Sequence, residues 1–281
     1  MRLAVGLCLW LNKFFKKPVH PFNLQNDGKI TYAEWQYEKG KDTIKNYLEA
    51  TDEKEMFEGK RVLDIGCGAA GKTIYYASLG VEKITGLEIL DKYKEKACSM
   101  AKNKGMEDKF EFITADAAAM PFPSDTFDTI IMNDAMEHVD MPLEVLNECY
   151  RVLKKGGKLY VNFPPFYHPY GAHLSDAIGF PWVHMFFSER TLVEAYKELV
   201  KELPDGNERI NFRISKNENG EEYFSYINHM TIRRFNRLLP ECGFVIAYYR
   251  EIPLRKVVWL LAKLPLFKEM FVKMTVAILE K

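Results

Sequence analysis

Short apolar runs alternate with longer amphipathic stretches along the middle of the chain. The apolar runs have the length and composition of buried strands and cover residues 61–65, 83–89, 110–114, 127–134 and 158–163. Between them, apolar side chains recur every three to four residues, as on one face of a helix, over residues 72–79, 91–104 and 142–155. Strands that alternate with helices at this spacing predict a parallel, doubly wound α/β sheet.

The alternation stops after residue 163. Residues 164–230 are rich in proline, histidine and aromatic side chains and follow neither period, which predicts an insertion. Beyond it the pattern predicts a helix, a strand, a strongly apolar helical insertion and a last strand, at 231–244, 244–252, 254–272 and 273–281. The pair Gly156-Gly157 is expected to end the helix of residues 142–155.

Two helices are predicted before the first strand. At residues 31–50, Thr31 and Glu34 have the spacing of a capping box. At residues 1–17, lysines follow one apolar helical face, which comprises Leu3, Leu7, Trp10, Leu11 and Phe14. Because the apolar run is short and no small-residue cleavage site follows it, we interpret this segment as an amphipathic surface helix and not as a signal peptide. A helix packed on its own domain stays an open alternative.

Charge and cysteine content narrow the class of protein. Lys plus Arg equals Asp plus Glu, at 39 each in 281 residues, whereas a dedicated nucleic-acid binder normally carries a basic excess. None of the five cysteines lies in a CxxC pair, so zinc ligation is not expected. Their odd number and irregular spacing fit a reducing, cytoplasmic compartment. No window reaches the roughly 18 apolar residues that a membrane-spanning helix needs.

A glycine-rich turn follows the first predicted strand. Its sequence, LDIGCGAAGKT at residues 63–73, matches the GxxxxGK[ST] pattern of a phosphate-binding loop from Gly66 to Thr73. It also places an acidic side chain, Asp64, two positions before the first glycine. The turn alone therefore leaves three ligands open: a phosphate, a dinucleotide and S-adenosylmethionine.

Three further strands end in polar side chains. Glu88 closes the second strand 20 residues after Gly68, where a carboxylate binds ribose hydroxyls in a doubly wound sheet. Asp116 follows the third strand, and Asn133 and Asp134 follow the fourth. Ligands of open α/β sheets bind outside the carboxyl ends of the strands, so these side chains are expected at one site with the turn. In a phosphate-loop protein Asp134 could be the acid that ends the strand beside the loop. Glu88 would have no function in such a protein.

At these residues the sequence resembles the class I S-adenosylmethionine-dependent methyltransferases, in particular the type-11 group (ubiquinone/menaquinone-biosynthesis and sugar O-methyltransferase-like). VLDIGCGAAG is similar to the family's first motif, GLEI to its ribose-binding segment, and ADAAAMPFPSDTFDTIIMNDAMEHV to its adenine-binding and fourth-strand motifs. The family's third glycine often stands at the position of Ala70, and here it is displaced to Gly71. The resemblance covers about residues 60–163. It implies a Rossmann-like sheet of seven strands with the last strand antiparallel, and a GKT segment that begins a helix.

The resemblance implies S-adenosyl-L-methionine as cofactor and a site built from the matching residues. Asp64 would meet the methionine ammonium, Glu88 the ribose hydroxyls and Asp116 the adenine amino group. Ile89 would pack on the adenine, and Asn133 would lie near the methionine amine or the ribose. The implied site comprises Asp64, Gly66, Cys67, Gly68, Glu88, Ile89, Asp116, Ala117 and Asn133, with Tyr32 or Trp35 of the N-terminal helix as a cover.

Together, pattern and resemblance predict four parts of the chain. They are an N-terminal helical cap, a cofactor-binding core, an acceptor-binding insertion and a core completion that contains the helical insertion 254–272. Their expected bounds are 1–58, 59–163, 164–230 and 231–281.

Three histidines are candidates for the general base that methylation of a hydroxyl needs. His138 follows the fourth strand, where some sugar O-methyltransferases of similar sequence use a histidine. His168 and His173 lie in the insertion. A structural role is the alternative for each. The histidines of the insertion and Asp176 match no metal-ligand spacing, so no metal site is predicted.

The expected activity is in-line methyl transfer to a small-molecule, sugar or lipid-linked acceptor, with O-methylation favoured. The alternatives are C-methylation of a quinone or isoprenoid-type acceptor and a non-catalytic protein that binds the cofactor or a membrane surface. Residues 1–17 and 254–273 combine apolar and basic side chains, as segments in a membrane interface do. A lid over the acceptor pocket or a homodimer interface would explain them equally. We expect a cytoplasmic protein, with peripheral membrane contact as an open possibility and no nucleic-acid partner.

Overall fold

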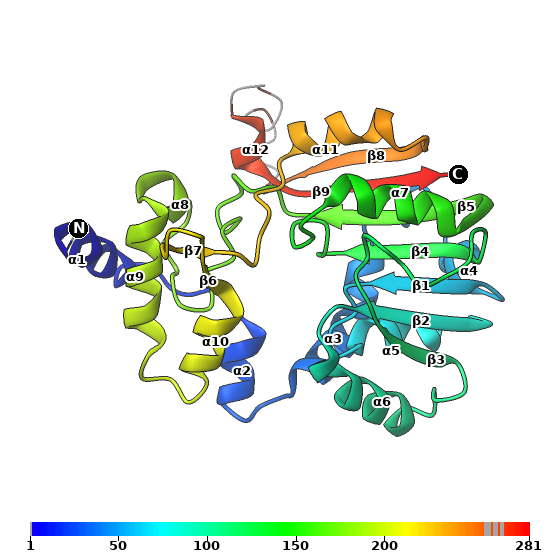
Figure 1. Ribbon diagram of the computed structural model, residues 1–281, viewed down its shortest axis with the longest axis horizontal. Coiled ribbons are helices and arrows are strands. Elements are labelled where there is room, and N and C mark those ends of the chain that lie inside the picture. Colours follow the sequence, from blue (N-terminus) through cyan, green and yellow to red (C-terminus); the bar gives the residue numbers. More distant parts are fainter. Residues whose placement is uncertain (1, 256–259, 261–263, 265–266) are drawn as a thin grey trace. The chain divides into compact units, whose positions relative to one another are not determined.

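The computed structural model describes residues 2–255, 260, 264 and 267–281. Its internal contacts divide the chain into two compact units, each assembled from separate segments (Figure 1). The first, here the core unit, comprises Thr31–Phe163, Ile232–Ile252 and Met274–Lys281. The second, here the accessory unit, comprises Met1–Ile30, Pro164–Thr231 and Pro253–Lys273. The predicted N-terminal cap of residues 1–58 is thus divided between the two units after Ile30.

Seven strands of the described chain form the sheet of the core unit, in the order β3-β2-β1-β4-β5-β9-β8. Their bounds are β1 Arg61–Ile65, β2 Lys83–Glu88, β3 Phe110–Thr114, β4 Phe127–Asn133, β5 Leu153–Phe163, β8 Val245–Pro253 and β9 Val272–Glu280. The five neighbours β3, β2, β1, β4 and β5 pair in parallel. Strand β9 runs antiparallel to β5, with Tyr160 opposite Ile278. This sheet confirms the predicted Rossmann-like fold.

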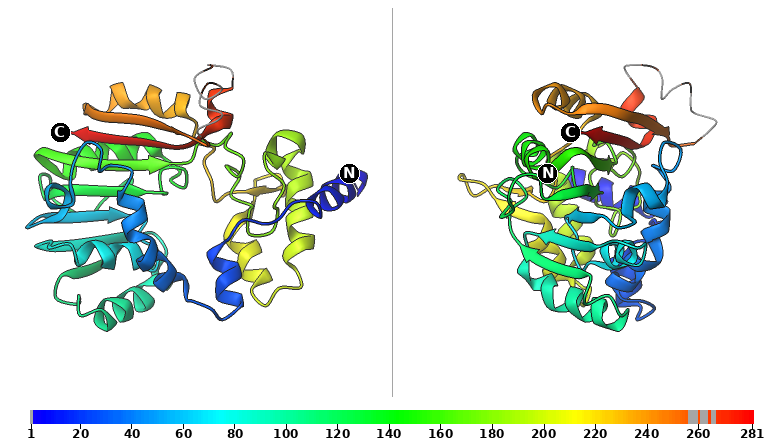
Figure 2. Two further views of the ribbon diagram at one scale, coloured as in Figure 1. Left: turned by 180° about the vertical axis from the view of Figure 1, so that it is seen from behind. Right: turned by 90° about the vertical axis from the view of Figure 1, so that its right-hand side faces the viewer.

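Helices cover both faces of this sheet (Figure 2). One face carries α3 (Tyr32–Ile44), α4 (Glu53–Phe57), α5 (Gly71–Ala77) and α6 (Lys94–Asn103), the last preceded by the 3-10 turn Asp91–Tyr93. The other face carries α7 (Pro142–Val152) and α11 (Ile232–Leu238), followed by the 3-10 turn Leu239–Glu241. Because both faces are covered, the central strands are buried on both sides and read as continuous apolar runs.

The capping box predicted for the N-terminal helix of the core is present. The backbone N–H of Glu34 donates to the hydroxyl of Thr31, and the Glu34 carboxylate accepts from the backbone N–H of Thr31. The helix ends at Ile44, and residues 45–50 form turns in place of the predicted helical continuation. The start of α3 is therefore fixed by its own sequence.

The predicted end of the helix at Gly156-Gly157 is wrong. The helix α7 ends at Val152, and Leu153 already pairs with Phe127 in the sheet. Gly156 lies inside β5 with a φ of 75°, a left-handed conformation that suits glycine. Residues 153–155, which helical periodicity predicts as the last turn of the helix, therefore belong to strand β5.

Most of the regular elements described in the accessory unit are helices. Its elements are α1 Arg2–Asn12, α2 Pro21–Asn26, α8 Val183–Phe186, α9 Glu189–Val200, α10 Gly206–Arg213, the antiparallel pair β6 Ile214–Lys216 and β7 Glu222–Phe224, and α12 Lys268–Phe271. In the predicted helical insertion 254–272, the described part is helical only at α12. Residues 256–259, 261–263 and 265–266 of that prediction lie outside the described residues. Among the helices that are described, none is long and apolar enough to cross a membrane.

A buried ionic cluster joins the helices of the accessory unit. The carboxylate of Asp176 accepts hydrogen bonds from Arg209 and Arg213, each at 3.1 Å, and from the hydroxyl of Tyr196 at 2.8 Å. Burial opposes ionisation of this acid, but Arg213 and its other neighbours outweigh burial and keep the pKa of Asp176 below its ordinary value. The carboxylate thus stabilises the packing of α9 against α10.

Candidate cofactor-binding site

The candidate site lies where the strands β1 and β4 end side by side in the core sheet. Sheet order changes direction at this pair, since β2 and β3 extend to one side and β5, β9 and β8 to the other. The crevice at such a switch point is the usual ligand site of a doubly wound fold. The carboxyl ends of β1, β2, β3 and β4 and the loops that follow them therefore supply most of the candidate residues.

The glycine-rich loop after β1 has a conformation that most side chains could not adopt. Gly66 and Gly68 have φ values of 72° and 52°, in the left-handed region. A Cβ on Gly66 would lie 2.9 Å from the Cβ of Ala135, in the loop after β4. The N–H groups of Gly66 and Cys67 both donate to the carbonyl of Leu87 in β2. The loop is therefore held tightly against two neighbouring strand ends, with Gly66 exposed and Gly68 partly exposed.

Glu88 is fixed beside this loop. One carboxylate oxygen accepts from the N–H of Gly68 and the other from the N–H of Leu90, both at 3.0 Å. The side chain is only partly buried, at the end of β2. The carboxylate is thus presented in one orientation, with lone pairs left for hydroxyl donors.

Asp64 is buried behind the loop. Its carboxylate accepts a hydrogen bond from the hydroxyl of Thr73, the third residue of α5. Burial raises the pKa of Asp64 to about 6, against the opposing effects of Thr73 and Lys72. Asp64 therefore binds its proton more tightly in the folded protein than in the unfolded chain. The stability that this proton contributes is present below the ordinary pKa and is lost as the pH rises through about 6.

The GKT segment begins a helix, as predicted. Helix α5 starts at Gly71, and the ammonium of Lys72 lies 2.7 Å from a carboxylate oxygen of Asp134. Burial disfavours the charged lysine, but Asp134 outweighs burial and raises the pKa of Lys72. This ion pair links the helix after β1 to the loop after β4. No pattern in the sequence predicts this ion pair.

Asn133 forms part of a buried polar network. Its side-chain oxygen accepts from the hydroxyl of Tyr47 at 2.6 Å and from the amide of Asn162 at 2.5 Å. Its amide nitrogen donates to the hydroxyl of Tyr76 at 3.1 Å. Both polar atoms of the Asn133 side chain are thus engaged within the protein. A contact of this residue with the cofactor stays a prediction.

The start of α3 packs on the glycine-rich loop. A Cβ on Gly71 would lie 2.0 Å from the backbone oxygen of Ala33, and one on Gly68 would lie 4.0 Å from the ring of Tyr32. The amide of Gln36 donates to the Tyr32 hydroxyl, and its own oxygen is buried with no hydrogen-bond partner in the described part of the chain. Trp35 is partly exposed on the same helix. The structure thus places Tyr32 at the loop and adds Gln36, which the sequence analysis missed.

The residues predicted at the adenine end lie after β2 and β3. Ile89 is 63% exposed, which is unusual for an isoleucine that directly follows a buried strand. Asp116 is exposed, and one of its carboxylate oxygens accepts from the N–H of Ala118 at 2.8 Å. Ala117 lies between them in this turn. An apolar surface and an oriented carboxylate are thus available at adjacent strand ends, and their contacts with adenine stay a prediction.

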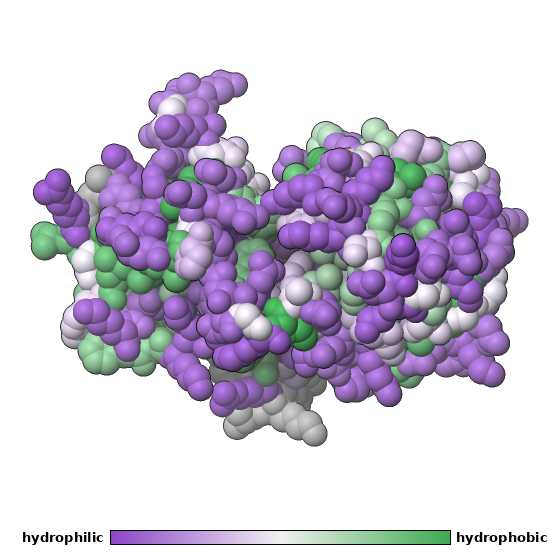
Figure 3. Space-filling model, turned by 90° about the horizontal axis from the view of Figure 1, so that it is seen from below, coloured by the Kyte–Doolittle hydropathy of each residue, from purple (hydrophilic) through white to green (hydrophobic). Residues whose placement is uncertain are grey.

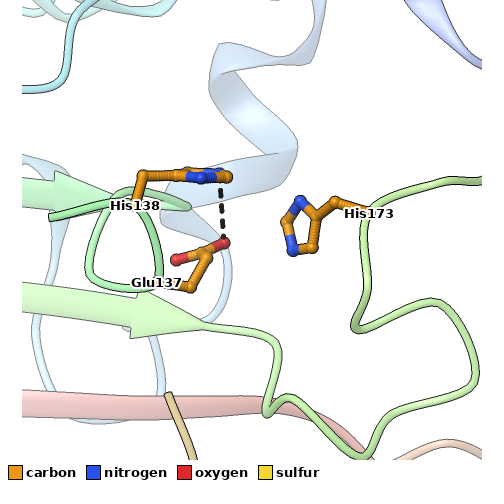
Figure 4. Close-up of side chains that lie close together, drawn as sticks. All are labelled: Glu137, His138 and His173. Atoms are coloured by element: carbon orange, nitrogen blue, oxygen red, sulfur yellow. Dashed lines mark ion pairs between the residues drawn. The ribbon is translucent and has the colours of Figure 1, made fainter. Parts of the chain in front are cut away.

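Of the three candidate bases, one lies in the core unit and two lie in the accessory unit. His138 belongs to the core unit, and its Nε2 lies 3.9 Å from a carboxylate oxygen of Glu137 (Figure 4). Burial and the charge of Asp134 raise the pKa of Glu137 well above its ordinary value. His173, also drawn in Figure 4, belongs to the accessory unit, where its Nδ1 lies 3.1 Å from the hydroxyl of Tyr226.

His168 is the third candidate base and lies in the accessory unit. Its Nδ1 accepts from the backbone N–H of Tyr170 at 3.2 Å. Burial, and secondly the charge of Lys273, lower the pKa of His168 to about 4. The imidazole is therefore neutral at physiological pH but only weakly basic, which favours a structural role in the turn.

Comparison with known proteins places the candidate site inside a recognised domain. Residues 63–161 match the family described as Methyltransferase domain. Over 106 residues the chain is 39% identical to a sterol 24-C-methyltransferase of Pneumocystis carinii (strain B80), covering 38% of this chain and 28% of that protein. Over 109 residues it is 34% identical to a ubiquinone biosynthesis O-methyltransferase of Pseudomonas putida (strain W619), covering 39% and 46%. The chain thus spans less than half the length of these relatives.

The fold has solved counterparts. A SAM-dependent methyltransferase from Methanosarcina mazei is 21% identical, with a TM-score of 0.50 over 81% of this chain and 94% of that one. The matched residues and the sheet define a class I S-adenosylmethionine-dependent methyltransferase domain. Residues 63–161 are similar to the type-11 group of that class, and the cofactor that this match supports is S-adenosyl-L-methionine.

Proposed function

We propose that the chain transfers the methyl group of S-adenosylmethionine to a hydroxyl of a small-molecule, sugar or lipid-linked acceptor. The observation that carries the proposal is the Glu88 carboxylate, oriented by two backbone N–H groups beside the glycine-rich loop. A carboxylate at this place accepts hydrogen bonds from the two hydroxyls of a ribose. A phosphate-binding loop would have no need of such a carboxylate. Isothermal calorimetry with S-adenosylmethionine, S-adenosylhomocysteine and NAD tests it. Binding of NAD alone would contradict the proposal.

The proposed reaction is an in-line displacement. The acceptor oxygen attacks the methyl carbon, the carbon–sulfur bond breaks with its electron pair going to sulfur, and S-adenosylhomocysteine leaves. The hydroxyl proton passes to a base, for which we propose His138 because it follows β4 at the carboxyl edge of the sheet. Most of the rate would come from aligning the acceptor with the methyl group.

Asp64 gives the proposed cofactor site a pH dependence. If the ammonium of the cofactor meets this carboxylate, binding favours the ionised acid, whose pKa without ligand is about 6. Affinity is therefore expected to rise about tenfold between about pH 5 and about pH 7. Calorimetry across this range measures the effect. In Asp64→Asn, affinity should be lower and nearly independent of pH; a wild-type affinity that does not change across the range would exclude this contact.

Replacing His138 by alanine is expected to lower turnover about a hundredfold, because the acceptor proton loses its base. The affinity for S-adenosylmethionine should change less than about twofold, since His138 is not assigned to the cofactor. Single-turnover assays with methyl-labelled cofactor, combined with calorimetry, separate the two quantities. Full turnover in the variant would remove His138 from the mechanism.

C-methylation of a quinone or isoprenoid-type acceptor is the second candidate. It is favoured by the 39% identity to a sterol 24-C-methyltransferase, although that match covers 38% of this chain. Labelled cofactor offered with sugars, hydroxylated quinols and lipid-linked glycans would reveal the acceptor. Mass spectrometry and NMR of the product then distinguish a methoxy group from a carbon-bound methyl. Cofactor binding without transfer to any acceptor would favour a non-catalytic protein.

A further inference from the structure

Helix α1 turns its larger apolar side chains outward. Leu3, Leu7 and Trp10 of this helix are 90%, 50% and 54% exposed, and Phe14, in the turn just after it, is 67% exposed. The opposite side of the helix, with the buried residue Cys8, packs on α9 within the accessory unit. The predicted helix is present but ends at Asn12. Of the apolar face named from the sequence, Leu3, Leu7, Trp10 and Phe14 face solvent, and Leu11 is partly buried.

The segment is anchored, so this exposure is not that of a loose terminus. The side chain of Asn12 donates to the carbonyl of Ala177 and accepts from the N–H of Gly179, at 3.2 and 2.8 Å. The ring of Phe15 stacks on Phe180 with 4.9 Å between centroids. The N-terminal segment is thus held on the accessory unit from its helical end.

The exposed apolar side chains continue beyond the helix. Phe180, which stacks on Phe15, also stacks on Phe186, and Phe186 is 68% exposed. Met185 beside it is exposed as well. We call the whole set the N-terminal apolar surface; it comprises Leu3, Leu7, Trp10, Phe14, Phe15, Met185 and Phe186. Hydrophobic side chains of the accessory unit reach the surface at the left of Figure 3.

The charged residues of the N-terminal segment have one sign. Residues 1–26 contain Arg2, Lys13, Lys16 and Lys17 and no aspartate or glutamate, in a chain with 39 acidic residues. These four basic side chains are exposed. Apolar and aromatic side chains bordered by lysine and arginine suit the headgroup region of an anionic bilayer, where tryptophan also partitions. A two-fold dimer through this face would instead bring the same cations of both copies into one interface.

We propose that the N-terminal apolar surface binds the surface of anionic membranes, with α1 lying in the plane of the interface. The segment lies on the bilayer and does not span it. Each apolar side chain contributes by leaving water, and each basic side chain by attraction to anionic lipid. This proposal does not rest on the methyl acceptor, because it concerns a surface that belongs wholly to the accessory unit.

Vesicle co-sedimentation of the full chain tests the proposal. Wild type is expected to bind phosphatidylcholine vesicles that contain phosphatidylserine, more weakly at high salt and on phosphatidylcholine alone. Leu7→Glu/Phe14→Glu should bind about a hundredfold more weakly. Its matched control, Val245→Glu/Ile246→Glu, changes two exposed apolar residues of the core unit and should bind as wild type does.

The basic side chains are tested separately. Lys13→Gln/Lys16→Gln/Lys17→Gln should bind anionic vesicles about tenfold to a hundredfold more weakly. Its control is a triple glutamine variant on α6, at the exposed residues Lys94, Lys96 and Lys102. Calorimetry with S-adenosylmethionine should give wild-type affinity in every variant, which shows that the fold is intact and keeps this test apart from that of the methyltransferase.

Three results would overturn the membrane proposal. One is that wild type does not bind anionic vesicles at low salt. Another is that the double glutamate variant binds as tightly as wild type. The third is a wild-type dimer, seen by sedimentation velocity, that Leu7→Glu/Phe14→Glu dissociates while vesicle binding is absent; this face would then be a contact between copies of the chain.

Discussion

Replacing Gly71 by alanine is expected to destabilise the core unit by about 3 kcal/mol. The new Cβ would lie 2.0 Å from the backbone oxygen of Ala33 and 2.6 Å from the Cβ of Gln36. A backbone oxygen cannot rotate away, so α3 would have to shift from α5 as a whole. Tyr32 would move with it, away from the glycine-rich loop. Equilibrium denaturation in urea, followed by circular dichroism, measures the loss.

The control for this variant is Gly6→Ala. Gly6 lies in α1, where an added Cβ would have nothing within 4 Å. Alanine is a better helix former than glycine, so this substitution should be neutral or stabilise by up to about 1 kcal/mol. If Gly71→Ala proves equally neutral, the close packing of α3 on the glycine-rich loop is not as described.

Replacing Glu88 by alanine is expected to weaken S-adenosylmethionine binding at least about a hundredfold. The variant removes the acceptor proposed for the ribose hydroxyls. It also leaves the N–H groups of Gly68 and Leu90 without the carboxylate that orients them. Both losses act on the same binding step, so calorimetry should show a large fall in affinity.

Two further variants make this result specific. Glu88→Gln keeps one acceptor oxygen and should bind with intermediate affinity. Glu95→Ala, which removes an exposed acid from α6, should bind as wild type does. Equal affinity in wild type and Glu88→Ala would remove the ribose contact and, with it, the observation on which the proposed function depends.

The sheet could be predicted from sequence because its strands are buried on both faces. At the centre of β4, Ile130, Ile131 and Met132 are consecutive, apolar and buried, and such a pattern can be recognised without knowledge of the neighbouring strands. Element ends were less predictable where tertiary pairing decides, as at Leu153, which joins β5 instead of continuing α7. The part of the accessory unit after β5 was predicted only as an insertion, since α9 and α10 are held together by the buried cluster around Asp176, which joins residues up to 37 positions apart.

The residues of the candidate site likewise fall into two groups, those predicted from the sequence and those found only in the structure. Motif spacing led to Asp64, the glycines, Glu88 and Asp116, because each lies at or just beyond the carboxyl end of a strand. The partners that hold the site came only from the structure. Lys72 and Asp134 are 62 residues apart, and Tyr47 and Asn162 are 115 apart. No local pattern signals such contacts, since each partner alone looks like an ordinary polar residue.

The interleaving of the two units along the chain has a consequence for how the protein folds. Strand β9 lies between β5 and β8, and its partner β5 is more than 100 residues earlier in sequence. The residues between them include most of the accessory unit. Contacts of such high sequence separation close large loops and slow folding. The segment β1 to β5 is therefore expected to collapse first with an open edge at β5, and this intermediate would be the form most exposed to aggregation until β9 docks.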